Sequence, residues 1–226
     1  MSVWRHLAGY WLSVSVSFAV YHAGGALWQL RLPAQVICPE FPFFAWLCPA
    51  FQEKLWVAGL NAALAVTIHE GAHALAARRA GAYAHLNNIA GWAVASSILA
   101  CGGVFIAAPA ISWTGARHGS AQQATVALTG PVASLAAALG WFALLSVVML
   151  YRVAVPPWWL YAGYVGFRMN AMLGLSSLLP VAPFDGAVSW QAQPMRYGLI
   201  VAVGLVLTFA LGNEQILQWL LHIVSK

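Results

Sequence analysis

Long apolar segments separated by short polar connectors make up most of this 226-residue chain. A helix rises 1.5 Å per residue, so about 20 apolar residues cross the hydrocarbon core of a bilayer. The segments cover residues 7–30, 55–77, 89–103, 122–151, 158–179 and 197–223. This pattern predicts an all-α polytopic membrane protein with about six transmembrane helices.

Composition agrees with that interpretation. Hydrophobic residues make up 62% of the chain and charged residues only 7%, whereas soluble domains are about 25% charged. The net charge of +5 is spread along the chain, which suits anchoring at an anionic bilayer surface and gives no basic cluster for nucleic acid. We therefore expect a single membrane-embedded domain over residues 1–226, with its core at 55–187, and no nucleic-acid partner.

Two features near the N-terminus have alternative interpretations. The first apolar segment is long for a signal peptide and is predicted to be a retained helix, although small residues at 23–26 would suit cleavage. Cys38 and Cys48 lie in the connector 31–54. They would pair in an oxidising compartment, which would leave Cys101 as a single thiol. The alternative is that all three cysteines stay reduced.

The most informative motif is His69-Glu70-Gly71-Ala72-His73, inside the second apolar segment. On an α-helix, residues four apart project from one face, so His69 and His73 can bind the same metal ion. Glu70 flanks that face and is better placed to accept a proton than to ligate. This spacing is typical of zinc hydrolases, in which two His ligands, a Glu base and a third ligand act together.

The alternative is a buried polar cluster that only forms hydrogen bonds. Ionisable groups in a membrane-spanning segment are costly and usually functional. The apolar setting therefore favours the metal site.

Two stretches interrupt the helical pattern. Residues 104–113 combine β-branched and aromatic side chains with Pro109, a composition that favours an edge strand over a helix. Extended backbone at membrane depth must be covered by protein or line a water-filled cavity. At 180–186, Pro180 and Pro183 end regular helix, and the unwound turn can direct Asp185 sideways into the bundle.

Taken in order, these motifs resemble those of the site-2 proteases, the intramembrane zinc proteases of the M50 type. The first motif is followed by Thr129-Gly130-Pro131 and then by Leu178-Leu179-Pro180-x-x-Pro183-Phe184-Asp185-Gly186. The extended stretch also looks like the segment before the Gly-Pro helix in archaeal-type members. The resemblance covers residues 55–187, without a PDZ or CBS-like domain.

The resemblance implies that His69, His73 and Asp185 are zinc ligands and that Glu70 is the catalytic general base. Asn170 matches an asparagine that the family places beside the active site. Zn²⁺ is the implied cofactor, and a transmembrane segment of another protein is the implied substrate. The implied location is a prokaryotic cell membrane, and the oligomeric state is left open. Two imidazoles and one carboxylate leave a fourth zinc position for water, whose proton Glu70 would accept.

A transmembrane substrate must unwind before its peptide bonds can be reached. An extended edge of the enzyme can hold the unwound peptide by β-augmentation. We therefore predict that the stretch containing Pro109 and Ile111 binds substrate. The alternative is a structural plug beneath the bundle.

The ligands also constrain topology independently of the family. Both motifs lie near the carboxyl ends of their segments, so segments 55–77 and 158–179 must cross the membrane in the same direction. The chain at 89–113 must then return to the side that it left, through its strand-like run or as a re-entrant unit. This places Arg78, Arg79 and Asp185 on one side, which the two arginines mark as cytoplasmic.

The chain departs from the family pattern at three positions. Ser134 and Ser177 stand where the family has asparagine, and Ala187 stands where it has a second glycine. The zinc chemistry is retained, so the metal site should form. The departures motivate a first rival, a weakly active or non-proteolytic relative that binds membrane proteins. A second rival, a metal-dependent transporter, predicts paired broken helices in repeated halves, and the sequence has one such break.

Overall fold

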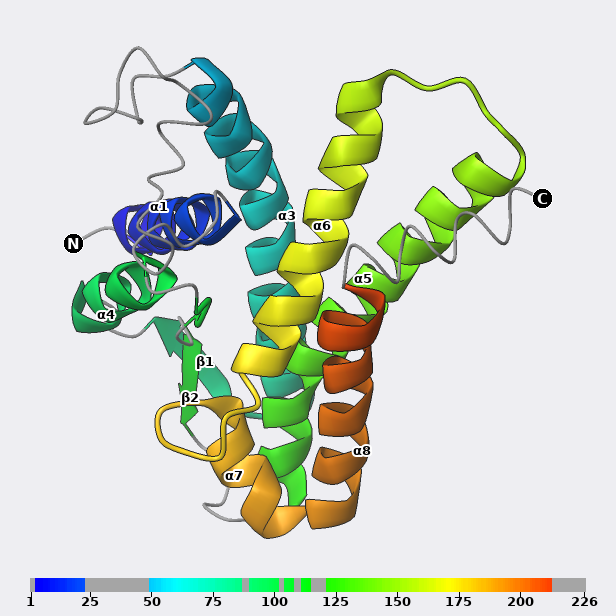
Figure 1. Cartoon of the computed structure of the whole chain (residues 1–226). Helices are drawn as coiled ribbons and strands as arrows, with labels where there is room; N and C mark the ends of the chain where they lie inside the picture. The colour runs from blue at the N-terminus through cyan, green and yellow to red at the C-terminus, as the bar shows by residue number, and fades with distance from the viewer. Residues whose placement is uncertain are drawn as a thin grey trace.

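The computed structural model describes residues 3–22, 49–86, 90–101, 104–107, 111–114 and 121–212. The described chain is predominantly helical, with one two-stranded sheet (Figure 1). In order, its elements are α1 (Val3–His22), α3 (Pro49–Arg79), β1 (Tyr83–Leu86), α4 (Ala90–Cys101), β2 (Ile111–Thr114), α5 (Ala121–Leu150), α6 (Pro157–Ser176), α7 (Asp185–Ala192), α8 (Pro194–Leu205) and the π-helix η2 (Val206–Leu211). The two alternatives for Cys38 and Cys48, paired or reduced, concern residues outside the described ones, as does the question of cleavage at 23–26.

Helix α3 is longer than the segment predicted from its apolar residues. It begins at Pro49, inside the predicted connector, because proline is well tolerated in the first turn of a helix. It ends as predicted at Gly81, whose φ of +69° is the left-handed conformation that glycine adopts freely. The amide of Ala82 donates to the carbonyl of Ala77 at 2.9 Å, which completes a Schellman cap.

The chain between α3 and α5 forms a unit that returns to its starting point. Strands β1 and β2 pair antiparallel, with Tyr83 opposite Thr114 and Leu86 opposite Ile111. Helix α4 has 12 residues and spans about 18 Å, which is too short to cross a bilayer. The chain thus returns beside the strand from which it left, as predicted, and the extended stretch is a strand at 111–114 but lacks regular structure at 104–107.

Figure 1 shows the consequence for the two helices that precede the metal-binding motifs. Helices α3 and α6 run in the same direction, and α5 runs in the opposite one. The predicted parallel course of the two segments is therefore confirmed, and the end of α3 lies at the same end of the bundle as α7.

Small residues allow α3 to pack closely against α1 and α6. Ala58, Ala62 and Ala65 recur at helical spacing and are almost fully buried. They share one core with Phe18 of α1 and Met169 of α6. Close approach of helices through small residues is the usual solution where lipid replaces water.

Helix α6 ends at Ser176, three residues before the predicted end of its segment, and a tight turn follows. The amide of Gly186 donates to the carbonyl of Ser177 at 3.1 Å, and the Tyr197 hydroxyl donates to the carbonyl of Leu178 at 2.8 Å. A side chain at Gly186 would collide with that Leu178 carbonyl. These contacts fold the turn back on α6 and place Asp185 at the first position of α7.

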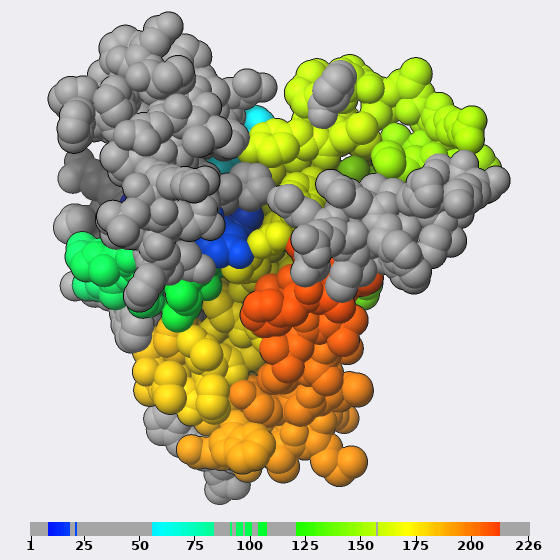
Figure 2. Space-filling view, in the orientation of Figure 1, coloured from blue at the N-terminus to red at the C-terminus, as the bar shows by residue number. Residues whose placement is uncertain are grey.

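Two of the described helices are long and apolar enough to cross a membrane, namely Ala121–Leu150 and Pro194–Leu211. Only 22% of the most apolar window of each is buried, so both face mostly outward. The surface of α8 and η2, orange to red in Figure 2, carries exposed apolar side chains such as Leu199 and Phe209. Such a surface suits contact with lipid.

Candidate metal centre

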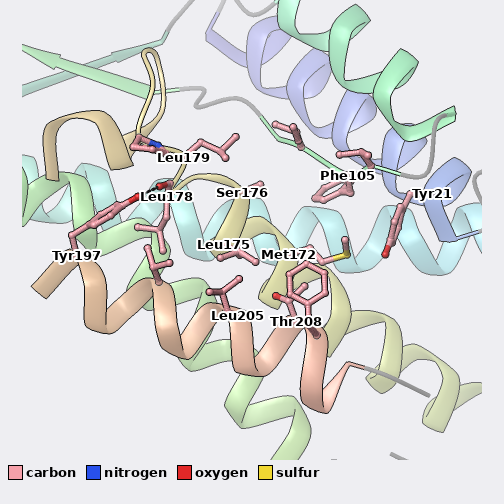
Figure 3. Close-up of a pocket in the computed structure, with 15 residues that line it drawn as sticks. Tyr21, Phe105, Met172, Leu175, Ser176, Leu178, Leu179, Tyr197, Leu205 and Thr208 are labelled. Atoms are coloured by element: carbon pink, nitrogen blue, oxygen red, sulfur yellow. Dashed lines mark hydrogen bonds between the residues drawn. The ribbon is translucent and has the colours of Figure 1, made fainter. Parts of the chain in front are cut away.

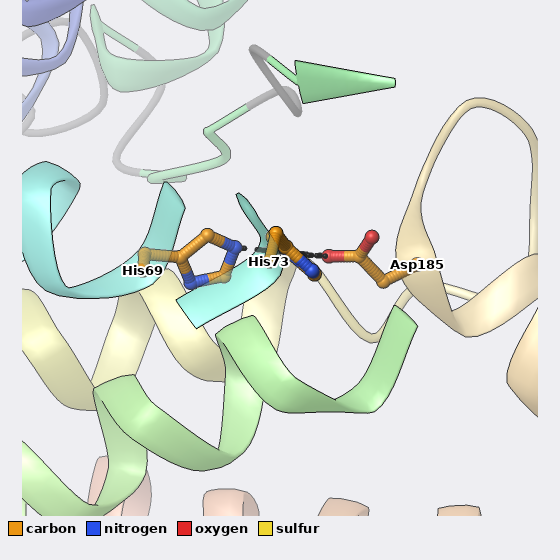
Figure 4. A group of neighbouring side chains, drawn as sticks. All are labelled: His69, His73 and Asp185. Carbon is orange, nitrogen blue, oxygen red and sulfur yellow. Dashed lines mark hydrogen bonds and ion pairs between the residues drawn. The ribbon is translucent and has the colours of Figure 1, made fainter. Parts of the chain in front are cut away.

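Three buried side chains converge from two distant parts of the chain. His69 and His73 come from one face of α3, and Asp185 comes from the start of α7 (Figure 4). Each is at most 4% exposed. Their ligand atoms all lie within 4.8 Å of one another, so the three side chains could hold a metal ion.

Two of the distances between ligand atoms are close to those around a tetrahedral metal ion. Asp185 Oδ2 lies 3.2 Å from His73 Nε2 and 3.7 Å from His69 Nε2. Ligand atoms about 2.1 Å from a tetrahedral zinc ion are about 3.4 Å apart. The donor set of two imidazoles and one carboxylate is also one that zinc prefers, with a further position left for water or substrate.

The second ring nitrogen of His73 explains why Nε2 is available to a metal. Its Nδ1 lies 3.0 Å from the carbonyl oxygen of Val126 on α5. A carbonyl can only accept a hydrogen bond, so Nδ1 must donate. In the neutral ring the lone pair is then on Nε2, which faces Asp185. Such a partner on the outer nitrogen fixes the orientation of a metal-binding histidine.

His69 is held in a similar way by Ser134, which is fully buried. Its Nδ1 lies 2.8 Å from Ser134 Oγ. The sequence analysis treated Ser134 only as a departure from the family pattern, whereas the structure gives it a direct contact with a predicted ligand. The sequence contained one indication that Ser134 faces the site: it follows Gly130 of the Gly-Pro motif by four residues and therefore lies on the same face of the helix.

Gly130 provides the space for the His73 ring. A Cβ atom built at Gly130 would collide with His73 Nε2 and would lie 2.6 Å from its Cδ2. The Gly-Pro motif therefore has a steric role here, since α5 can approach the ring only where no side chain intervenes.

Glu70 lies beside the two histidines and is 4% exposed. The Tyr10 side chain from α1 is also buried, at 4%, and forms a hydrogen bond with the Glu70 carboxylate. The sequence gave no indication of Tyr10, because nothing in its local pattern relates α1 to the motif in α3.

The predicted substrate-binding residues have three different outcomes. Asn170 is fully buried on α6, where its Nδ2 donates to the Gly166 carbonyl at 2.8 Å and its Oδ1 has no hydrogen-bond partner among the described residues. No described contact links it to the three converging ligands. Ile111 is the first residue of β2 and lies opposite Leu86. Pro109 lies outside the described residues.

An apolar cavity of about 490 Å³ lies next to the turn that carries Asp185 (Figure 3). Phe105 of the extended stretch, Leu175 of α6 and Leu205 of α8 line it, and Leu178 and Leu179 belong to the turn itself. The cavity therefore connects the extended stretch with the segment leading to the candidate metal centre.

Comparison with known proteins gives no match among family models, curated proteins or solved structures.

Proposed function

We propose that this chain is a membrane-embedded zinc endopeptidase of the site-2 protease type, which cleaves transmembrane segments of other membrane proteins. The observation that carries the proposal is the convergence of His69, His73 and Asp185 at zinc-ligand distances, with Glu70 beside them. The hydrogen-bond partners on the outer nitrogens of both histidines add support, because metal-binding histidines usually have such partners.

Each residue has a role in peptide hydrolysis. A zinc ion held by the three ligands would act as a Lewis acid that polarises the scissile carbonyl and acidifies the attacking water. Glu70 accepts the proton of that water and transfers it to the leaving amine. The Tyr10 hydroxyl donates to Glu70 and positions its carboxylate.

The surroundings of the site suit an unwound apolar peptide. The cavity next to the Asp185 turn has apolar walls, as a transmembrane substrate requires. Among the described residues, strand β2 pairs with β1 alone, and a substrate strand added to its other edge would find backbone hydrogen-bond partners. Ile111, at the first position of β2, would contact that strand.

The proposed membrane arrangement is polytopic, with crossings by α3, α5, α6 and α8 with η2. Four crossings replace the six or so expected from the sequence, because α4 is too short to span and α1 lies across α3 in Figure 1. The unit β1–α4–β2 is re-entrant and lies at the same end as α7.

This topology predicts the labelling of three exposed positions. Single cysteines replacing Tyr83 and Met195, which are 78% and 88% exposed, should react with an impermeant thiol reagent from the same side of the membrane. A cysteine replacing Tyr151, at the other end of α5, should react only from the opposite side. These single cysteines are introduced into a background in which Cys38, Cys48 and Cys101 have been replaced by serine. Labelling of the first two positions from opposite sides would exclude the proposed arrangement.

Zinc content tests the ligand assignment directly. Purified wild type should contain one zinc ion per chain, and His69→Ala, His73→Ala and Asp185→Ala should each lose it, because two remaining ligands hold zinc weakly. Elemental analysis measures the ratio, and cleavage of a reconstituted transmembrane substrate should be lost in the same preparations.

Asn61→Ala is the matched control for these variants. Asn61 is a buried polar residue on α3 whose Nδ2 donates to the carbonyls of Val57 and Ala162, away from the site. It should keep its zinc even if its stability falls. Full zinc occupancy in His69→Ala or His73→Ala would refute the site, and a zinc-loaded wild type that cuts no transmembrane substrate would refute the proteolytic function.

A further inference from the structure

A second hollow lies on the outer side of the helices that form the candidate metal centre. It is a groove of about 760 Å³ between the carboxyl-terminal half of α3, the amino-terminal half of α5 and α8. This volume is typical of sites that bind small ligands. Leu75, Val132 and Ile200 give it apolar walls, one from each helix, and Leu75 and Val132 are 51% and 44% exposed.

One part of the groove is polar and positively charged. Arg79, in the last turn of α3, and Arg196, in the first turn of α8, both line it, together with Gln122 and Gln193. Arg196 Nη1 donates to Gln193 Oε1 at 3.2 Å. The groove thus combines an apolar trough with two cations.

The two arginines have no carboxylate partner among the described residues. The whole chain has five acidic residues, and of these Glu70 and Asp185 are buried in the candidate metal centre. No ion pair between Arg79 or Arg196 and a carboxylate occurs in the part of the chain that the structure describes. Two cations at the end of an apolar trough are complementary to an anion that carries an apolar chain.

We propose that this groove binds one anionic phospholipid, with its phosphate at Arg79 and Arg196 and an acyl chain along Leu75, Val132 and Ile200. A peptide fits the groove less well. Its backbone would need hydrogen-bond partners, whereas the walls are helices whose backbone groups are already paired within each helix. An acyl chain needs none, and guanidinium groups bind phosphate oxygens through charge-assisted hydrogen bonds.

Lipid retention during native mass spectrometry tests the headgroup contact. Wild type incubated with phosphatidylglycerol should retain one more lipid molecule per chain than wild type incubated with phosphatidylcholine. The double variant Arg79→Gln/Arg196→Gln should bind that lipid about thirtyfold more weakly, given the usual contribution of each basic residue near an anionic surface. The control is Arg78→Gln, because Arg78 lines a separate hollow with Gly81 and Tyr83, and it should bind as wild type does.

A second pair of variants tests the acyl contact. Val132→Trp fills the trough and should displace the lipid although both arginines remain. Val147→Trp is its control, since Val147 lies on the same helix at a similar exposure, 49%, and does not line the groove. It should leave retention unchanged.

Several results would overturn the proposal. They are equal retention of the two lipids, unchanged retention in the double variant or in Val132→Trp, and release of the lipid by inorganic phosphate, which would indicate a site for free anions. Loss of substrate cleavage in the double variant with lipid retention intact would instead assign the groove to a substrate peptide. Glu70→Gln should retain the lipid, because the inference depends on membrane embedding and not on proteolysis.

Discussion

Replacing Glu70 with glutamine should slow cleavage of a transmembrane substrate by about 10²–10⁴-fold, the usual contribution of general-base assistance, while zinc remains bound. Glu70 is adjacent to the ligand face and is not one of the three converging ligands. Glutamine keeps the shape of the side chain and can still accept a hydrogen bond from Tyr10, but it cannot take up the proton of water at neutral pH. Cleavage and zinc content should be measured on the same reconstituted preparations.

Two further variants make this result interpretable. Glu70→Asp retains a carboxylate with a shorter reach and should recover part of the lost rate. His73→Ala should lose zinc and cleavage together, which separates loss of the base from loss of the metal. If Glu70→Gln cleaves as fast as wild type, Glu70 is a packing residue and its catalytic role is wrong.

Replacing Gly130 with alanine should displace the His73 ring and weaken metal binding by about 10–100-fold. That is the usual effect of disturbing the residues that orient a metal ligand. The added methyl group would occupy the space of His73 Nε2 and lie 2.6 Å from its Cδ2. The ring must then rotate away from Asp185 and from the Val126 carbonyl. A zinc-affinity titration measures the loss, and cleavage should fall with it.

Gly140→Ala is the control in the same helix. Nothing lies within 4 Å of a Cβ atom at Gly140, so alanine there should leave zinc affinity unchanged and favour the helix by about 0.5–1 kcal/mol. Wild-type zinc affinity in Gly130→Ala would mean that His73 does not pack against α5 as described.

The sequence predicted those features that depend on neighbours along the chain. The spacing of His69 and His73 places both on one helix face, because helical periodicity follows from local backbone geometry. Gly81 ends α3 for a local reason as well, since its left-handed conformation closes the cap. The break between α6 and Asp185 follows from the prolines at 180 and 183, although α6 ends three residues earlier than predicted.

The surroundings of the metal centre were decided by packing between helices. The Val126 carbonyl is an acceptor for His73 only because α5 lies against α3, and a backbone carbonyl leaves no mark in the sequence. Tyr10 reaches Glu70 from 60 positions earlier in the chain. Ser134 was interpreted by comparison with asparagine in a family pattern, whereas its role follows from its contact with His69.

The sequence by itself therefore determined which side chains are chemically competent and which helices carry them. Tertiary structure decided how closely Asp185 approaches His69 and His73, that Gly130 makes room for a ring, and that α5 supplies a carbonyl to His73 (Figure 4). The physical reason is that helical periodicity and caps are properties of adjacent residues, whereas ligand distances depend on how closely separate helices approach. That approach is set jointly by the side chains of every helix in the bundle.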